Sequence, residues 1–160
     1  MRLVLIALLL IGATQDKKLE FVEHAGMKFV NPTVENLIIL VNSNENELDE
    51  YLTSNDFKKT EDLKGVLKYR KYFKEKQSFQ ELLKFKEGGS ISLWWTNDFR
   101  KNSLIDIEKE LGDPYRVRTL TNVYRKYHYL KKGESEYKIN TYENKDQGIE
   151  EVSVEKRKNN

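Results

Sequence analysis

The chain contains no cysteine, and this absence excludes several kinds of site. Its 160 residues offer no catalytic thiol and no cysteine ligand for a metal, and no disulfide can cross-link the fold. A lipid anchor of the bacterial lipoprotein type is excluded too, because the lipid is attached to a cysteine. The fold must therefore depend on its core, and a hydrophobic fraction of 38% with many Phe and Tyr is sufficient to build one.

An excess of charge of one sign is also missing. The 28 basic and 26 acidic residues leave a formal charge of +2, which provides no general attraction to nucleic acid or anionic lipid. The carboxylates are interleaved with lysines, as on a solvated surface, and the sequence does not single out an acid pair. We therefore expect a partner other than nucleic acid.

Motifs for common chemistries are absent as well. There is no Gly-x-Ser-x-Gly elbow, phosphate loop or Gly-rich dinucleotide turn. The two histidines, His24 and His128, are not at metal-ligand spacing, and we expect His128 to face solvent from a strand. We accordingly expect no cofactor, no metal and no catalytic residue.

The N-terminal residues have the layout of a secretory signal peptide. Met1 and Arg2 form a short basic start, residues 3–11 are an uninterrupted apolar run, and Gly12, Ala13 and Thr14 are small or polar. The run is too short to span a bilayer, and no later segment approaches that length. We expect residues 1–14 to be removed, and residues 15–160 to form one domain in the periplasm or outside the cell. Retention of the leader as a short anchor stays open.

A repeated tetrapeptide organises the rest of the chain. Tyr-Arg-Lys-Tyr occurs at residues 69–72 and again at 124–127, each time inside a strand-like run. Both runs follow an amphipathic helical stretch and precede two further strand-like runs. The expected strands are residues 66–73, 79–85 and 90–96 in the first half, and 123–130, 137–142 and 149–155 in the second. We therefore predict an α+β fold of two tandem αβββ units, at about 33–97 and 102–155, forming an antiparallel sheet with the helices packed on one face.

The helices have recognisable starts and ends. Thr33 can cap a helix through the residue three positions on, and apolar residues then recur at helical spacing up to Val41. The run 37–41 is also compatible with a strand, so both readings stay open, with helix favoured. A second short helix is expected at 47–54, ended by a left-handed Asn55, and a third from Ser103 to the stop signal at 112–114.

The repeated motif also suggests a binding surface. Alternation along a strand puts Tyr69 and Lys71 on one face and Arg70 and Tyr72 on the other. A purely structural role would pack one tyrosine against the helices and use the basic residues for solubility. A binding role would use an open sheet face that carries the candidate residues Arg70, Tyr72, Trp94, Arg125, Tyr127 and Tyr129. Such side chains are enriched at interface anchors. The adjacent Trp94 and Trp95 cannot both be buried on one side of a strand, so one of them is expected to face solvent or a partner.

The layout of residues 33–155 resembles the β-lactamase-inhibitor-protein-like folds, which include the SmpA/OmlA outer-membrane-assembly modules. It is also similar to small secreted proteins of the Bacteroidota. The sequence carries no diagnostic motif of these families and lacks the lipidated cysteine of the SmpA/OmlA lipoproteins. The resemblance implies binding to another protein, and no family residue is carried over.

We therefore expect an exported, non-catalytic binding module that uses an exposed aromatic and basic sheet face to hold a protein or envelope component. Two alternatives stay open. One is an immunity or inhibitor protein that neutralises a toxin or enzyme, and the other is an enzyme with a dispersed carboxylate site. The sequence identifies neither the partner nor the oligomeric state.

Overall fold

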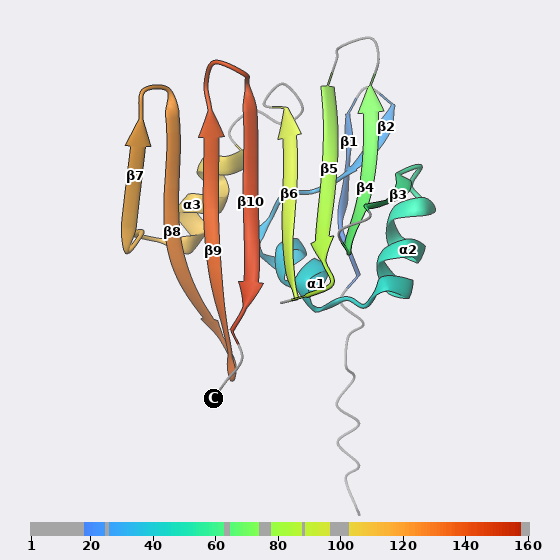
Figure 1. The fold of residues 1–160 in the computed structure, drawn as a ribbon, viewed down its shortest axis with the longest axis horizontal. Helices are drawn as coiled ribbons and strands as arrows, with labels where there is room; N and C mark the ends of the chain where they lie inside the picture. The colour runs from blue at the N-terminus through green and yellow to red at the C-terminus, as the bar shows by residue number, and fades with distance from the viewer. Residues whose placement is uncertain are drawn as a thin grey trace, which may run out of the picture.

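A computed structural model describes residues 18–24, 26–62, 65–73, 78–87, 89–96 and 103–157. The expected leader and the expected turn at 74–77 lie outside this part of the chain. Eight strands form one antiparallel sheet in the order β3-β4-β5-β6-β10-β9-β8-β7 (Figure 1). Their bounds, in that order, are Lys58–Asp62, Val66–Phe73, Ser78–Phe85, Ser90–Thr96, Ile149–Lys156, Ser135–Asn144, Val123–Lys132 and Arg116–Leu120. The predicted α+β class with a large antiparallel sheet is confirmed.

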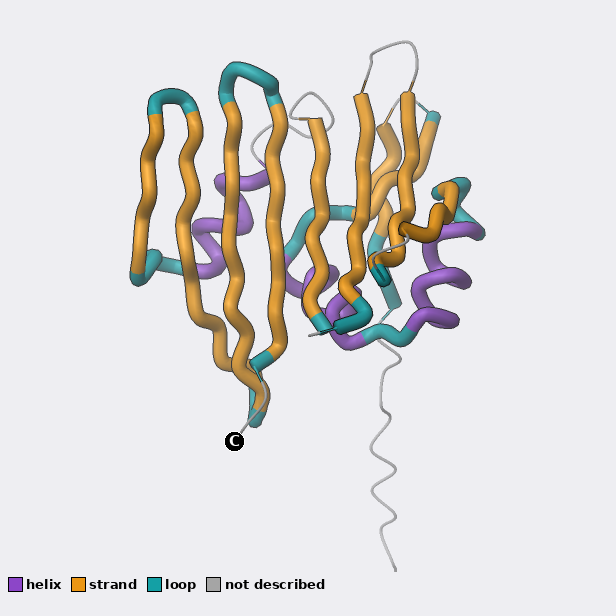
Figure 2. Tube along the Cα trace, viewed as in Figure 1, coloured by secondary structure: helices purple, strands orange, loops and turns teal. Residues whose placement is uncertain are grey.

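The helices and a small hairpin lie on one side of this sheet (Figure 2). Helix α1 (Val34–Asn42) contacts β6 and β10, and α3 (Ser103–Leu111) contacts β8 and β10. The hairpin of β1 (Phe21–His24) and β2 (Met27–Val30) lies behind β4 and β5, while α2 (Glu45–Thr53) lies against the edge strand β3. Among the described residues, no helix has the length and apolar character needed to cross a membrane.

The helices lie close to their predicted positions. The Thr33 side chain accepts a hydrogen bond from the Asn36 backbone N–H at 3.2 Å, and residues 34–42 are helical, so the strand alternative for this segment is wrong. Helix α2 begins two residues earlier than predicted, at Glu45, with a capping box on Asn44. After α2 the left-handed residue is Asp56, with φ of 63°, and not the predicted Asn55, whose side-chain amide instead donates to the Tyr51 carbonyl at 2.8 Å.

The strands are more numerous than predicted, and most of the predicted ones are longer. Strands β4 and β6 begin and end where predicted, and β5, β8, β9 and β10 are longer by one to four residues. Strands β3 and β7 were not predicted, so each half contains a four-stranded meander where three strands were expected. Both extra strands are edge strands rich in charged residues, so their sequences carry little apolar alternation, and pairing with β4 or β8 decides their conformation.

The register places the two tetrapeptides at corresponding positions in the sheet. At the centre, β6 and β10 pair antiparallel with Trp94 opposite Glu151. Tyr69 lies opposite Leu82 of β5, which lies opposite Leu93, the residue before Trp94. Tyr124 lies opposite Glu143 of β9, which lies opposite Glu150, the residue before Glu151. Each tetrapeptide therefore lies at the same distance from the central pair, on the second strand of its own meander.

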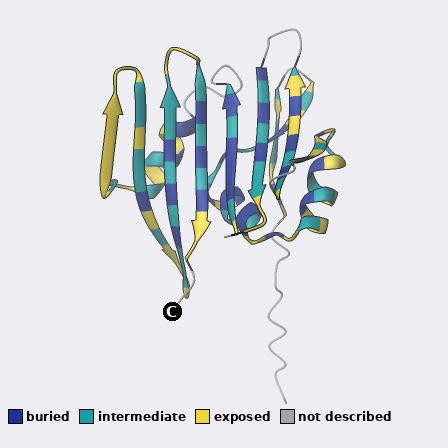
Figure 3. Cartoon of the chain, viewed as in Figure 1, coloured by how far each residue is buried: buried dark blue, intermediate teal, exposed yellow. Residues whose placement is uncertain are grey.

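The core lies between the sheet and the helices, and buried positions alternate along the central strands (Figure 3). Trp95 is the largest fully buried side chain. Its Nε1–H donates to Glu150 at 2.6 Å and to the Ser103 hydroxyl at 2.9 Å, and that hydroxyl donates to Glu150. Burial raises the pKa of Glu150, and the hydrogen bonds from Ser103 and Trp95 oppose the change. This network holds the start of α3 against the sheet.

Buried polar side chains tie the remaining elements to the sheet. Gln80 is fully buried; its amide oxygen accepts from the Val30 N–H and its amide nitrogen donates to the Val30 carbonyl, both at 2.8 Å. The Lys71 ammonium donates to the carbonyls of Lys28 and Asn55. Burial lowers the pKa of Lys71, and the charge of Asp56 opposes this. Backbone groups of the β1–β2 hairpin thus find partners on β4 and β5.

Replacing Gln80 by leucine is expected to loosen this hairpin. Gln80→Leu keeps most of the volume but leaves the N–H and C=O of the fully buried Val30 without partners, which costs about 2–4 kcal/mol of unfolding free energy. Urea unfolding measures the loss, and amide hydrogen exchange at Val30 is expected to accelerate. The control is Gln147→Leu in the exposed β9–β10 turn, expected within about 0.5 kcal/mol of wild type. Equal effects of the two changes would contradict the assignment.

Candidate functional site: the open face of the sheet

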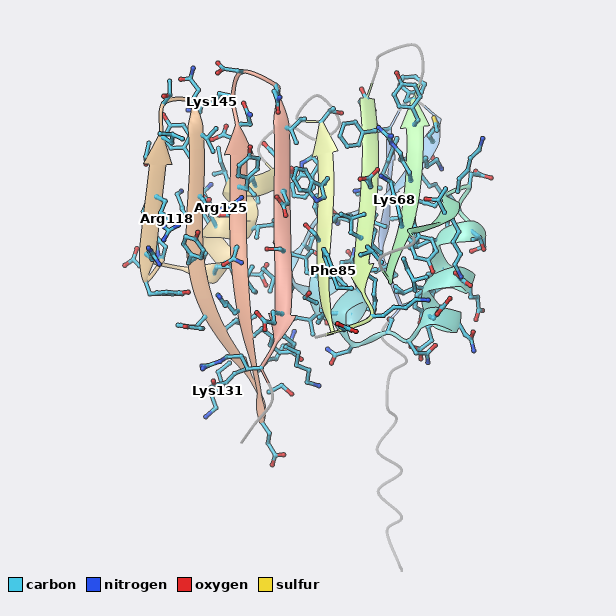
Figure 4. The ribbon with its side chains drawn as sticks, in the orientation of Figure 1. Lys68, Phe85, Arg118, Arg125, Lys131 and Lys145 are labelled. Carbon is cyan, nitrogen blue, oxygen red and sulfur yellow. The ribbon has the colours of Figure 1, made fainter. Side chains whose placement is uncertain are left out.

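The face of the sheet opposite α1, α3 and the β1–β2 hairpin, here called the open face, is covered by no helix or strand among the described residues (Figure 4). The strand register determines which side chains lie on it. Its aromatic residues are Tyr72, Phe79, Phe85, Trp94, Tyr127, Tyr129 and Tyr142. Its basic residues are Lys58, Lys68, Arg70, Arg116, Arg118, Arg125, Lys131 and Lys138, and its acidic residues are Glu81, Glu136, Glu151 and Glu155.

The six residues selected from the sequence all lie on this face. Tyr72 and Tyr129 are 46% and 53% exposed, whereas Trp94 and Tyr127 are half-buried. They do not form one compact site, because five strand spacings, about 24 Å, separate the backbones of β4 and β8. The selected residues instead form a cluster on each half of the sheet, with Trp94 between them.

The first cluster surrounds Arg70 on β4. Its guanidinium lies over the ring of Phe79 at 5.0 Å and near that of Tyr72 at 6.0 Å. Its Nε is 3.5 Å from a carboxylate oxygen of Glu81, and the Lys68 ammonium is 2.9 Å from the same oxygen. Contacts of this kind are individually weak at an exposed surface. Together they hold the arginine beside two aromatic rings on the exposed surface.

The second cluster is a tyrosine platform at β7 and β8. Tyr115, in the segment before β7, stacks on Tyr129 with ring centroids 4.3 Å apart and planes 8° from parallel. Arg116 lies over the ring of Tyr127 at 5.7 Å, and Arg157 lies over Tyr129 at 5.3 Å. The rings are oriented by one another and by these cations, so little side-chain freedom remains to be lost on binding.

Two arginines lie side by side next to this platform. Arg118 on β7 lies directly opposite Arg125 on β8, and like charges in this arrangement destabilise a sheet. Arg125 also lies over the ring of Tyr142, with 5.1 Å between the guanidinium carbon and the ring centroid. Within the described part of the chain, Arg116, Arg118 and Arg125 make no ion pair. An anionic partner would relieve this repulsion.

A hollow of about 270 Å³ lies at the centre of the face, between Trp94, Glu151, Asn140 and their neighbours. The Ser92 hydroxyl donates to the Glu151 carboxylate, and the Trp94 ring packs against Tyr142 at 6.1 Å. The indole nitrogen of Trp94 and the amide oxygen of Asn140 are shielded from solvent and have no hydrogen-bond partner among the described residues. Burial raises the pKa of Glu151, opposed by the Ser92 hydrogen bond and the charge of Arg125. The volume suits one side chain of a partner better than a cofactor.

Several members of the face were missed in the sequence. Tyr142 was assigned to a strand, and alternation from the buried Ile139 would have placed it opposite the core. Tyr115, Arg116 and Arg118 gave no usable signal, because no strand was predicted there.

The prediction that His128 faces solvent is wrong. Its side chain is only 1% exposed and lies on the covered face near α3, because the register of β8 places it beside Ile139. Burial lowers the pKa of His128, and the charge of Glu108 opposes the change. His24 lies in β1, with its ring against Phe29. Across the described residues, no group of three His, Asp or Glu side chains could hold a metal ion.

Replacing Glu151 by glutamine is expected to change how stability depends on pH. Because burial raises the folded-state pKa of Glu151 above its usual 4.5, its ionisation destabilises the fold as pH rises through and beyond that value. Glu151→Gln removes this penalty and retains an acceptor for Ser92. The urea midpoint of the variant is therefore expected above wild type at pH 7 and equal to it at pH 3.5. Glu155→Gln, which removes the same charge from an exposed position of β10, is the control, and an equal gain there would contradict the explanation.

The fold and its open face were compared with known proteins. No protein-family model, no curated protein sequence and no solved structure matches this chain.

Proposed function

We propose that this protein is a non-catalytic binding module that uses the open face to hold a partner protein with an acidic surface. The observation that carries the proposal is the combination of aromatic and arginine side chains on a face that no described element covers. Eight strands span roughly 34 Å. That width is sufficient for a standard protein interface of about 800 Å² per partner.

The charge of the face favours an acidic partner. Arg116, Arg118 and Arg125 have no ion-pair partner among the described residues, whereas Glu81 is already held by Lys68 and Arg70. Carboxylates on a partner would reduce the repulsion between Arg118 and Arg125 as well as gain charge-assisted hydrogen bonds. Charge complementarity of this kind also accelerates encounter.

The central hollow supports an anchor at the middle of the interface. Residues that dominate binding energy tend to lie near the centre of an interface, and tryptophan, tyrosine and arginine are the most common among them. Trp94, Tyr142 and Arg125 are in contact along one row across β6, β9 and β8, next to the hollow. A partner side chain entering there would pack beside Trp94 and Asn140, which line the hollow.

The proposal includes the two finer inferences from the sequence. The chain is a tandem duplication of a helix-and-meander unit, which is supported by the corresponding positions of the two tetrapeptides about the Trp94–Glu151 pair. The protein acts after export, in the periplasm or outside the cell, which is supported by the layout of residues 1–14.

The test is affinity capture of a partner from the native envelope by wild type and by two open-face variants. Trp94→Ala and Arg125→Ala are each expected to reduce recovery of an acidic partner at least tenfold, because Trp94 lines the central hollow and Arg125 is one of the arginines that would pair with the partner's carboxylates. The control, Lys109→Ala, removes an exposed cation from α3 on the opposite side and is expected to leave recovery unchanged. Export is tested separately, by sequencing the N-terminus of the mature protein.

Capture that both open-face variants retain at the wild-type level would show that the partner binds elsewhere. Urea midpoints of the three variants distinguish loss of contact from loss of fold.

A further inference from the structure

Strand β7 is one of the two edges of the main sheet, and it is exposed at all five positions (Figure 3). Among the strands that the structure describes, it pairs with β8 alone. An edge strand presents alternate backbone N–H and C=O groups that are not paired within the sheet, and natural proteins usually cover or interrupt such an edge.

The opposite edge is protected in a way that β7 is not. Helix α2 lies against β3, and Lys59 of β3 is held by Glu45 at 3.0 Å and Asp49 at 2.7 Å of that helix. Helix α3 contacts β8 and β10, and the exposed side chain of Val117 shows that it leaves β7 uncovered. Within the described part of the chain, the sheet therefore has one covered edge and one free edge.

The side chains of β7 define what would fit beside it. Arg116 and Arg118 point to the open face, next to Arg125, while Val117 points to the other face and is 54% exposed. An added strand would therefore be favoured by carboxylates at alternate positions, facing the arginines, with an apolar residue between them beside Val117.

We infer that β7 is a docking edge for an extended acidic segment of the partner, which adds to the sheet as a ninth strand. Backbone hydrogen bonds supply the pairing, and the alternation of acidic and apolar side chains supplies the selectivity. The inference rests on the proposed function, because the same acidic partner supplies the segment, but it concerns a different surface from the central hollow.

A second copy of this chain fits the edge poorly. Antiparallel pairing of two β7 strands over their full length would place Arg118 opposite Arg118 of the second copy, with Arg125 of each copy in the next strand. Four arginines would then lie in one row without a carboxylate among them, so the charges favour an acidic strand over self-association.

The experiment uses the protein and a synthetic heptapeptide of alternating glutamate and valine, blocked at both ends. Titration is followed by the backbone amide signals of the protein. We expect saturable shifts at residues 116–120, added hydrogen-exchange protection there, and affinity that falls steeply with salt. A peptide with lysine in place of glutamate is expected not to bind.

Two further probes separate strand addition from attraction of charge alone. The same peptide with an N-methyl group at every residue keeps its charge but has no backbone N–H to donate along either edge, and its affinity is expected to fall at least tenfold. Arg118→Ala is expected to reduce affinity for the unmodified peptide at least tenfold. Lys131→Ala removes the same charge about 20 Å further along β8 and is expected to have no effect.

Equal binding of the N-methylated peptide, or shifts confined to β3 or to the central hollow, would overturn the ninth-strand inference. A second contrary result would be that the peptide-free protein dimerises and that Arg118→Ala strengthens the dimer. That result would overturn the inference too, because the edge would then serve a second copy. These outcomes leave the proposed function standing, since capture through Trp94 is tested independently. Trp94→Ala is expected to retain peptide binding.

Discussion

The antiparallel pairing of β6 with β10 is the interaction on which the rest of the structure depends. These strands come from different halves of the chain, and their ladder joins two four-stranded meanders into one sheet. Leu93 lies opposite Val152, and both are fully buried on the face that the helices cover. Hydrophobic burial on this face therefore determines the register of the two strands. A slip of β10 by one residue would move Val152 to the open face and bring Glu151 into the core.

The covered side uses polar groups as well as apolar packing to position its layers. Gln80, Lys71 and Glu150 are all buried, and each bonds to a different element: the β1–β2 hairpin, the segment after α2, or the start of α3. An unpaired buried polar group is costly, so these bonds exclude other placements of the layers. With the layers held on one side, the opposite side of the sheet stays uncovered.

The open face, unlike the covered face, carries groups that destabilise the fold. Three features lower the stability of the isolated chain: Arg118 beside Arg125, the raised pKa of Glu151, and an indole nitrogen of Trp94 that has no hydrogen-bond partner among the described residues. Strained or unsatisfied groups of this kind tend to gather where a protein binds something. Here they lie in one row, and an acidic partner would relieve the part of their cost that comes from the two arginines.

Local patterns in the sequence were sufficient for much of this arrangement. Period-two alternation determined which side of their strands Arg70, Tyr72 and Trp94 occupy, and a capping residue determined where α1 begins, because both effects depend on near neighbours in the chain. Only the tertiary structure decided that β3 and β7 are strands, that His128 is buried, and that Arg118 meets Arg125. Those outcomes depend on which strands pair and on where α3 ends over the sheet, and these are contacts between residues distant in sequence that no local pattern encodes.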